Sequence, residues 1–274
     1  MLRVAVYRRW FYAVAGCLVL NALPSAAADD ELVLFQDTGD SPVSTIELLG
    51  DMPVRLLNHA RDGRRLVAVA ELPPGWSRAL PLEREHTVEV LVLEGELSFD
   101  GVVMGPYHYA HLPGAAAAPV WTAAAQGAKL LLFLDPPRDT DGKRTRIIDT
   151  QRLSWRAGVV AERDTGVTLA VEVKDLLWVE ETGQRTWLLR MGADFSFPWE
   201  VHDTPEEGFL LEGNFRIGEC IDDVPIHGDY KPGGYFYRPE GIPHGGLESG
   251  TDSSAFFLLR TPTKLTVSFQ DSCP

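Results

Sequence analysis

The sequence has few cationic side chains. Its 25 Lys and Arg residues stand against 39 Asp and Glu residues, which gives a formal charge of −14 at pH 7. A surface of this charge repels the phosphate backbone of nucleic acids and anionic lipid headgroups. Nucleic acid is therefore excluded as a partner.

Long apolar runs are also missing. A membrane-spanning helix needs about 20 mostly apolar residues, and no segment after residue 28 approaches that length. Residues 1–28 carry Arg3, Arg8 and Arg9 ahead of the apolar residues 10–23 and end in Ala-Ala-Ala, a pattern typical of a signal peptide. This pattern predicts a periplasmic or secreted protein without an integral membrane span. Acylation of Cys17, within a lipoprotein-like VAGC sequence, is the alternative.

Cysteine is rare, with three residues in the whole chain. Cys17 lies in the predicted signal peptide, so Cys220 and Cys273 remain after cleavage. An oxidising compartment permits a disulfide between them, but sequence alone does not show whether two cysteines are close enough to bond. A disulfide and two separate thiols both stay open.

Sustained helical periodicity is absent as well. Short apolar runs recur between Gly, Pro and Asp clusters, as in VEVLVLEGEL, AKLLLFL, GFLLEGNF and SAFFLLR. This spacing predicts an all-β fold of the sandwich or barrel kind. Residues 136–150 form the most polar and turn-rich segment, which marks a boundary between two domains.

An internal repeat supports the two domains. Residues 88–99 and 206–217 align, with Leu-Glu-Gly at 93–95 over Leu-Glu-Gly at 211–213. Each copy is predicted to be one β-barrel of domain size, produced by tandem duplication. The expected boundaries are an N-terminal barrel at 29–140, a linker at 141–163 and a C-terminal barrel at 164–274.

Side chains of the second copy predict a metal site. Glu200 and His202 share one face of a strand because strand side chains alternate. Glu206 opens the next strand, and His244 follows a Pro-x-Gly turn. In an antiparallel barrel, His202, Glu206 and His244 meet at one end of the interior. Two imidazoles and one carboxylate suit Fe(II), and they also accept Mn or Zn.

These spacings resemble the paired motifs of the cupin superfamily. The first motif runs from His202 to Gly213, and the second runs from Gly233 to His244. The resemblance implies a bicupin with two tandem double-stranded β-helix barrels, the cupin jelly roll, and the pairing of barrel faces in a homodimer. More narrowly, EEGFLLEGNF and GDYKPGGYFYRPEGIPHG are similar to ChrR-like cupins, which include acetylacetone-cleaving dioxygenases, and to exported bicupins of the DUF4437 family.

One position departs from the cupin motif. Where the family has His-x-His, this chain has Glu200-Val201-His202. Glu200 is a fourth, oxygen ligand, a carboxylate that orients His202, or a general base, and the sequence leaves these three roles open. Arg238, next to the metal-side turn, is either an anchor for a substrate carboxylate or enolate, or half of a structural ion pair.

The first copy lacks these ligands. The alignment places Leu82, Arg84, Val88 and Ala118 at the positions of Glu200, His202, Glu206 and His244. The N-terminal barrel is therefore expected to bind no metal and to serve as scaffold, interface or lid. His86 and Glu89 are expected on a solvated charged rim, and His108 and His111 are expected to be ordinary strand residues.

Aromatic residues alternate along three strands around the predicted site. They are Phe195, Phe197 and Trp199, then Phe209 beside Leu211, then Tyr235 and Tyr237. About half of them must point into the barrel. Those at its mouth would favour a small, partly apolar ligand.

Two functions follow from these features. The first is a metal-dependent enzyme, a dioxygenase or an isomerase or lyase, that acts on a small oxygenated compound such as a dicarbonyl or a hydroxy acid. In it, Glu200 supports proton transfer. The second is a non-catalytic module that binds a metal or a small ligand, as the resemblance to ChrR suggests.

Overall fold

The structure, a computed structural model, describes residues 32–60, 62–79, 86–114, 119–138, 145–162, 168–193, 195–196 and 198–273. The predicted signal peptide and Cys17 lie outside these residues. Within them the chain forms β-strands, turns and the short 3-10 helices η1 (Thr38–Asp40), η2 (Glu47–Leu49) and η4 (Thr150–Arg152). No helix in the described part is long and apolar enough to cross a membrane.

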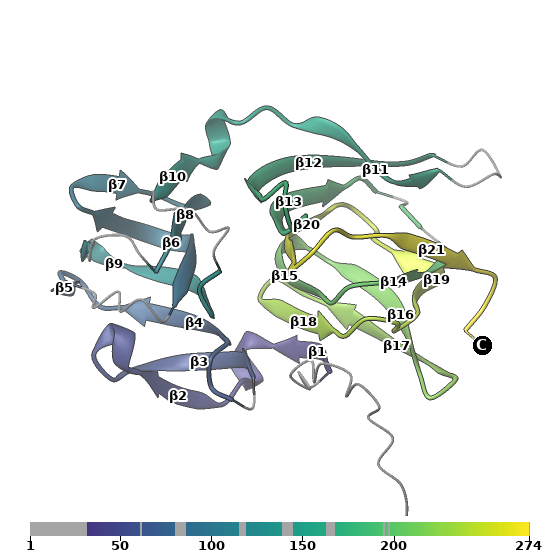
Figure 1. Ribbon diagram of the computed structural model, residues 1–274, viewed down its shortest axis with the longest axis horizontal. Coiled ribbons are helices and arrows are strands. Elements are labelled where there is room, and N and C mark those ends of the chain that lie inside the picture. The colour runs from purple at the N-terminus through teal and green to yellow at the C-terminus, as the bar shows by residue number, and fades with distance from the viewer. Residues whose placement is uncertain are drawn as a thin grey trace, which may run out of the picture.

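The first barrel is built from one nine-stranded antiparallel sheet (Figure 1). Its strands are β2 (Val43–Ile46), β3 (Met52–His59), β4 (Leu66–Leu72), β5 (Ser77–Ala79), β6 (Thr87–Phe99), β7 (Val102–Met104), β8 (His108–Leu112), β9 (Val120–Asp135) and β10 (Arg146–Asp149). The main path runs β10-β8-β6-β9-β4-β3-β2. Large apolar side chains fill the interior, among them Leu97, Trp121 and Leu130.

The second barrel consists of a seven-stranded and a five-stranded sheet. Its strands are β1 (Val33–Asp37), β11 (Arg156–Glu162), β12 (Thr168–Trp178), β13 (Arg185–Met191), β14 (Trp199–His202), β15 (Glu206–Gly213), β16 (Phe215–Ile221), β17 (Val224–Tyr230), β18 (Gly234–Arg238), β19 (His244–Gly250), β20 (Ala255–Thr261) and β21 (Val267–Gln270). The orders are β1-β18-β15-β20-β13-β12-β11 and β17-β16-β19-β14-β21. Apolar side chains of both sheets share one core.

The two barrels repeat one strand order, which agrees with the internal repeat in the sequence. β8, β6, β9, β4, β3 and β2 occupy the same places in the first sheet as β18, β15, β20, β13, β12 and β11 in the second. Gly95 and Gly213, aligned in the sequence, both have positive φ and both pair with an alanine of the neighbouring strand. A Cβ at either glycine would collide with the backbone of that strand. The aligned glycines are therefore required by the same bend.

The barrels exchange their first strands. β1 and β10 each precede a 3-10 helix whose first turn is capped by an aspartate, Asp37 or Asp149. β1 pairs with β18 of the second barrel, whereas β10 pairs with β8 of the first (Figure 1). Each barrel therefore contains a strand from outside its expected range. The limits 29–140 and 141–163 stay predictions. The expected linker itself contains the whole of β10 and β11.

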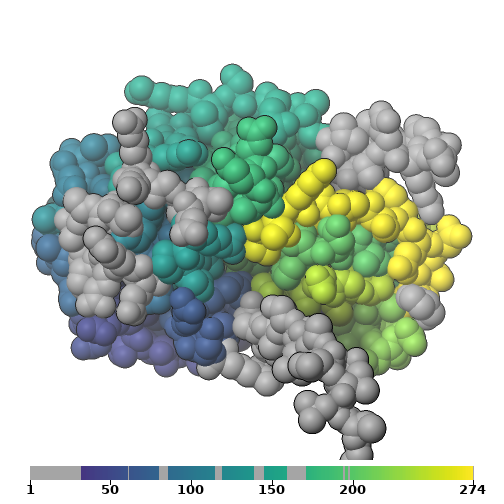
Figure 2. All heavy atoms as spheres, viewed as in Figure 1, coloured from purple at the N-terminus to yellow at the C-terminus, as the bar shows by residue number. Residues whose placement is uncertain are grey.

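An apolar layer joins the two barrels, which lie side by side in Figure 2. Along β4, Ala68 and Ala70 face the interior of their own barrel, while Val67 and Val69 face the layer. β15 and β18 contribute their outward side chains to it in the same way. These strands are buried on both faces, which explains why their sequences are almost continuously apolar.

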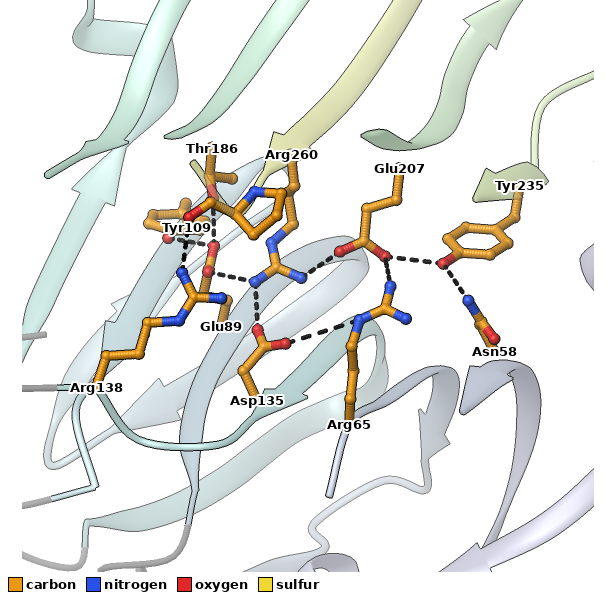
Figure 3. Close-up of polar contacts among 11 residues, drawn as sticks. Asn58, Arg65, Glu89, Tyr109, Asp135, Arg138, Thr186, Glu207, Tyr235 and Arg260 are labelled. Carbon is orange, nitrogen blue, oxygen red and sulfur yellow. Dashed lines mark hydrogen bonds and ion pairs between the residues drawn. The ribbon is translucent and has the colours of Figure 1, made fainter. Parts of the chain in front are cut away.

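A buried ionic network lies within this junction (Figure 3). Arg260 of β20 contacts three carboxylates: Glu89 at 2.8 Å, Glu207 at 2.6 Å, and Asp135. Glu207 also pairs with Arg65 at 2.7 Å. Tyr109 and Thr186 donate hydrogen bonds to Glu89, and Tyr235 donates one to Glu207. The network therefore ties strands of the first barrel to strands of the second.

The position of Glu89 corrects one prediction from the sequence. Glu89 is 1% exposed and belongs to this network, so it does not lie on a solvated rim. β6 is covered by the other barrel on the face that carries Glu89, and Arg260 supplies the compensating charge. His108 and His111 are strand residues of β8, as expected.

Acid should weaken this junction. Burial raises the pKa of Asp135, but Arg260 and Arg65 outweigh it and hold that pKa below its ordinary value. A carboxyl group with a lowered pKa in the folded state stabilises the fold above its unfolded pKa of about 4, and this stabilisation is lost as the pH falls through the folded pKa. We expect the urea midpoint to fall between about pH 5 and pH 3, and to fall less steeply in Asp135→Asn. Identical slopes in both proteins would contradict this assignment.

Candidate metal centre

Three strands of the second barrel place the predicted site residues. β14 carries Glu200 and His202, β15 begins at Glu206, and β19 begins at His244. Glu200 pairs with His244 across β14 and β19, which brings these strands together at the site. Strand alternation turns Glu200 and His202 to the same side, into the barrel interior.

Glu200, His202 and His244 form a compact buried cluster. Oε1 of Glu200 lies 3.5 Å from Nε2 of His202 and 3.4 Å from Nε2 of His244. The two imidazole rings meet edge to face, with their centroids 4.6 Å apart. One potential ligand atom from each residue lies within 4.8 Å of the others, and no other such group of three occurs in the described residues. All three side chains are buried.

The donor atoms of this cluster fit a divalent metal ion. Nδ1 of His244 lies 3.0 Å from the carbonyl oxygen of Ile242. A carbonyl oxygen only accepts hydrogen bonds, so Nδ1 carries the proton and Nε2 presents its lone pair. Ligand bonds of about 2.0–2.2 Å place neighbouring ligand atoms about 2.8–3.6 Å apart, which includes the separations from Glu200. Oε2 of Glu200 and Nδ1 of His202 are also buried without a hydrogen-bond partner in the described structure.

The electrostatic environment of the cluster also favours a cation. Burial raises the pKa of Glu200, but the contacts with His202 and His244 outweigh it and lower that pKa to about 2. Burial lowers the pKa of His202, but Glu206 and Glu200 outweigh it, so that pKa is raised. Glu200 is therefore ionised at neutral pH, which is the state that metal binding requires.

Glu206 lies outside this group of three. Its Oε2 is 3.7 Å from Nδ1 of His202, on the side of the ring opposite the atom that faces Glu200. Nη1 of Arg238 holds the same oxygen at 3.0 Å. Glu206 therefore lies beside Nδ1 of His202, the ring nitrogen that points away from Glu200. A carboxylate in this position orients an imidazole that binds a metal through its other nitrogen.

Arg238 is paired with two carboxylates. Its guanidinium donates to both oxygens of Glu219, at 2.7–2.9 Å, and to Glu206. The arginine and both acids are buried. This is the structural ion pair that the sequence left open as the second role of Arg238. Arg238 therefore holds Glu206 in place by a hydrogen bond.

Sequence reasoning missed Glu219, the main partner of Arg238. Glu219 is fully buried in β16, on the same inner face as Phe215 and Ile217. This spacing of two residues was the available signal, because a carboxylate on an apolar face of a strand needs a buried cation.

A cavity of about 520 Å³ adjoins the cluster. Glu200, His202, Glu206, Arg238 and His244 form one part of its lining. Most of the remaining wall is apolar and comes from β12, β13, β16 and β20. A bound ion would therefore face a space that admits a ligand.

The aromatic residues divide between the cavity and the junction. Phe195 and Phe236 line the cavity. Phe209, Leu211, Tyr235 and Tyr237 belong to the apolar layer that faces the other barrel. Phe197 lies outside the described residues. The sequence could not assign these faces because both sides of β15 and β18 are buried.

The first barrel offers no equivalent cluster in its described part. Val88, at the position aligned with Glu206, is fully buried in the apolar interior. Leu82, Arg84 and Ala118 lie outside the described residues. His108 lies 3.7 Å from Asp149 of β10, away from any such group.

A disulfide joins the segment after β21 to β16. Cys220 of β16 is bonded to Cys273, with Cα atoms 5.5 Å apart, so the pairing that the sequence left open is present. Cys273 follows β21, which pairs along the whole of β14. The bond therefore anchors the strand that supports Glu200 and His202.

Comparison with known proteins agrees with this architecture. Residues 143–264 match the family model of the ChrR cupin-like domain, and this range contains the whole cluster. No curated protein matches the chain in sequence. The prediction of two tandem cupin barrels is confirmed by the strand order and by solved structures of this fold.

Three solved structures illustrate the similarity. A putative dioxygenase from Nostoc punctiforme is 18% identical, with a TM-score of 0.64 over 90% of this chain and 88% of that one. A putative glyoxylate-induced protein from Pseudomonas aeruginosa is 15% identical, with a TM-score of 0.62 over 97% and 100%. Oxalate decarboxylase from Lactobacillus farciminis is 11% identical, with a TM-score of 0.57 over 86% and 88%. At these identities the similarity concerns the fold alone.

Proposed function

We propose that this chain is an exported bicupin that binds one divalent metal ion in its C-terminal barrel and acts as a metal-dependent enzyme on an oxygenated organic compound. Glu200, His202 and His244 hold the ion, which is Fe(II), Mn or Zn. The convergence of their three donor atoms beside a cavity carries the proposal. When bound, the ion supplies Lewis-acid chemistry by polarising substrate oxygen atoms.

Three protein ligands favour an enzyme over a closed structural site. Structural zinc sites are generally closed by four protein ligands, whereas catalytic sites keep a position open for water or substrate. The cluster offers three donors, and the cavity provides access on the open side. The reaction is that of a dioxygenase, an isomerase or a lyase. The resemblance to acetylacetone-cleaving dioxygenases implies the first of these.

The chain's own residues divide the work at this site. Glu200 faces both imidazoles through Oε1, and its second oxygen has no hydrogen-bond partner in the described structure, so it offers the substrate a hydrogen-bond acceptor at the cavity wall. Arg238 and Glu206 act as positioning residues by fixing the ring of His202. The apolar wall excludes water from the substrate.

Export forms part of the same proposal. The signal-peptide pattern of residues 1–28 supports it. The disulfide between Cys220 and Cys273 supports it independently, because such bonds persist in oxidising compartments.

A second candidate function is a non-catalytic binding module. The match of residues 143–264 to the ChrR cupin-like domain favours it. Such a module uses the same metal cluster, and occupancy changes its contacts with a partner protein. The two functions therefore share the site and differ in turnover.

Metal content tests the site and separates Glu200 from Glu206. Purified wild-type protein should contain about one divalent ion per chain, and Glu200→Ala and His244→Ala should lose it, because each removes a direct donor. Glu206→Gln should keep the ion with affinity reduced by about 10–100-fold, as expected for a carboxylate that orients a ligand. Elemental analysis and competition with a chelator give both quantities. Glu94→Gln, at an exposed carboxylate of β6 in the other barrel, serves as the matched control. Retention of metal by both alanine variants would refute the assignment.

Turnover separates the two functions. Oxygen uptake and product formation are measured on Fe(II)-, Mn- and Zn-loaded protein with a panel of β-dicarbonyls and hydroxy acids. Turnover that is lost in His244→Ala supports the enzyme. Absence of turnover with every metal, together with co-purification of another exported protein that depends on metal occupancy, supports the binding module.

A further inference from the structure

The cavity beside the metal centre has a second polar end. Arg156, Asp175 and Arg185 line it, on β11, β12 and β13. Asp175 lies between the two arginines: Arg185 contacts Oδ1 at 2.7 Å, and Nε of Arg156 contacts Oδ2 at 3.0 Å. Two guanidinium groups facing one carboxylate leave this end with a net positive charge.

This end is reachable from solvent and bounded by aromatic rings. The side chains of Arg185 and Arg156 are 23% and 55% exposed, in contrast to the buried Arg238. The guanidinium of Arg185 stacks over Trp187 at 4.5 Å. Trp178, 50% exposed, also lines the cavity. An exposed tryptophan beside a stacked arginine offers contact to a flat apolar group that carries an anion.

The strand register gives the backbone separation of Arg185 from Glu206, which lies beside the metal cluster. Arg185 pairs with Thr261, and the adjacent Arg260 pairs with Glu207, next to Glu206. Arg185 therefore lies near the level of Glu206, two strands away across β20. At about 4.8 Å per strand, the backbones are about 10 Å apart.

The metal end of the cavity carries a net negative charge. Glu200, Glu206 and Glu219 carry three negative charges there, and Arg238 carries one positive charge. A divalent ion would make this end neutral, so the arginines of the second end would supply the unbalanced charge of the cavity. A ligand with one negative charge far from its metal-facing oxygens matches this distribution.

Building on the proposed function, we propose that the substrate is a bulky, monoanionic compound. It has an apolar, preferably aromatic, body, a pair of oxygens at the metal end, and a carboxylate or similar anion at Arg156 and Arg185. The cavity of about 520 Å³ lies in the range of about 300–1,000 Å³ for sites that hold larger ligands. A five-carbon dicarbonyl would fill only a small part of it.

Binding of three probes tests this substrate class. Acetylacetone is small, benzoylacetone adds an aryl group, and 4-carboxybenzoylacetone adds an anion about one ring away. Dissociation constants are measured by calorimetry and by quenching of tryptophan fluorescence, for which Trp178 and Trp187 of the cavity are reporters. We expect each addition to strengthen binding by roughly tenfold or more. Equal affinity for all three probes would overturn the inference.

Variants at each end make the test specific. Arg185→Gln should weaken the carboxylated probe by roughly tenfold or more and leave benzoylacetone nearly unchanged, and Arg185→Lys should restore part of the loss. Val171→Phe, which places a larger side chain in the cavity, should weaken the binding of both aryl probes and leave the binding of acetylacetone unchanged. Arg216→Gln, in an exposed pair with Asp229 away from this cavity, is the control. An unchanged affinity of the carboxylated probe in Arg185→Gln would refute the anion site.

The outcomes distinguish this inference from the proposed function. Metal content and probe binding are measured on the same samples, with and without chelator. One ion per chain without preference for the aryl anion would end the inference and leave the metal site standing. Binding of the aryl anion at Arg185 by protein that takes up no metal would support the pocket and refute the proposed function.

Discussion

Replacement of Arg260 by alanine is expected to lower the free energy of unfolding by about 3–5 kcal/mol. Arg260 is buried against Glu89, Glu207 and Asp135 in the junction between the barrels. Its removal leaves carboxylates without their main cation in a place that water does not reach, and an unpaired buried charge is strongly destabilising. Urea unfolding followed by far-ultraviolet circular dichroism measures the loss.

A double-mutant cycle identifies the cause. If unpaired charge dominates, Glu207→Gln should recover part of the stability in the Arg260→Ala background while it destabilises the wild type. Arg216→Ala removes an arginine from an exposed ion pair and should leave the midpoint almost unchanged. Additive effects of the Arg260 and Glu207 substitutions would show that the network contributes by packing alone.

Removal of the disulfide should destabilise the protein by a similar amount. Cys220 and Cys273 are 53 residues apart, and closing a loop of that length restricts the unfolded chain by roughly 4 kcal/mol in the chain-entropy model. Cys273→Ser should therefore shift the urea midpoint downward, and a reducing agent should shift the wild type to the same value. A reducing agent should have no effect on the variant.

The disulfide also offers a test of its connection to the metal centre. Because β21 pairs with β14, a loosened C-terminal segment should weaken the support of Glu200 and His202. We expect Cys273→Ser to release its metal to a chelator faster than the wild type. The same release rate in both proteins, alongside a lower urea midpoint, would confine the effect of the bond to global stability.

The barrels were predictable because duplication leaves a signal in one sequence. Leu-Glu-Gly recurs at 93–95 and 211–213, and both glycines occupy the same bend. The strand exchange was not predictable. β1 and β10 are short segments of similar character, and nothing in their composition indicates which barrel each one joins.

The site was predictable to the extent that its residues lie in motifs. Spacing placed His202 and His244 at one end of a barrel, and the structure brings them together with Glu200. Spacing does not report side-chain direction, so it could not show that Glu206 faces Nδ1 of His202 and bonds to Arg238. Arg156 and Arg185 stayed hidden because a positively charged residue near a strand end usually lies on a solvated surface.

The exchange of β1 and β10 has a consequence for the order in which the protein is made. β1 emerges early from the ribosome, yet Val33 pairs with Tyr237, near the other end of the chain. The barrel that holds Glu200, His202 and His244 is therefore completed by a segment synthesised before the rest of the first barrel. Closure of this barrel must wait for a contact of very long sequence separation, which slows folding. It also means that neither copy could have been discarded after the duplication without breaking the sheet of the other.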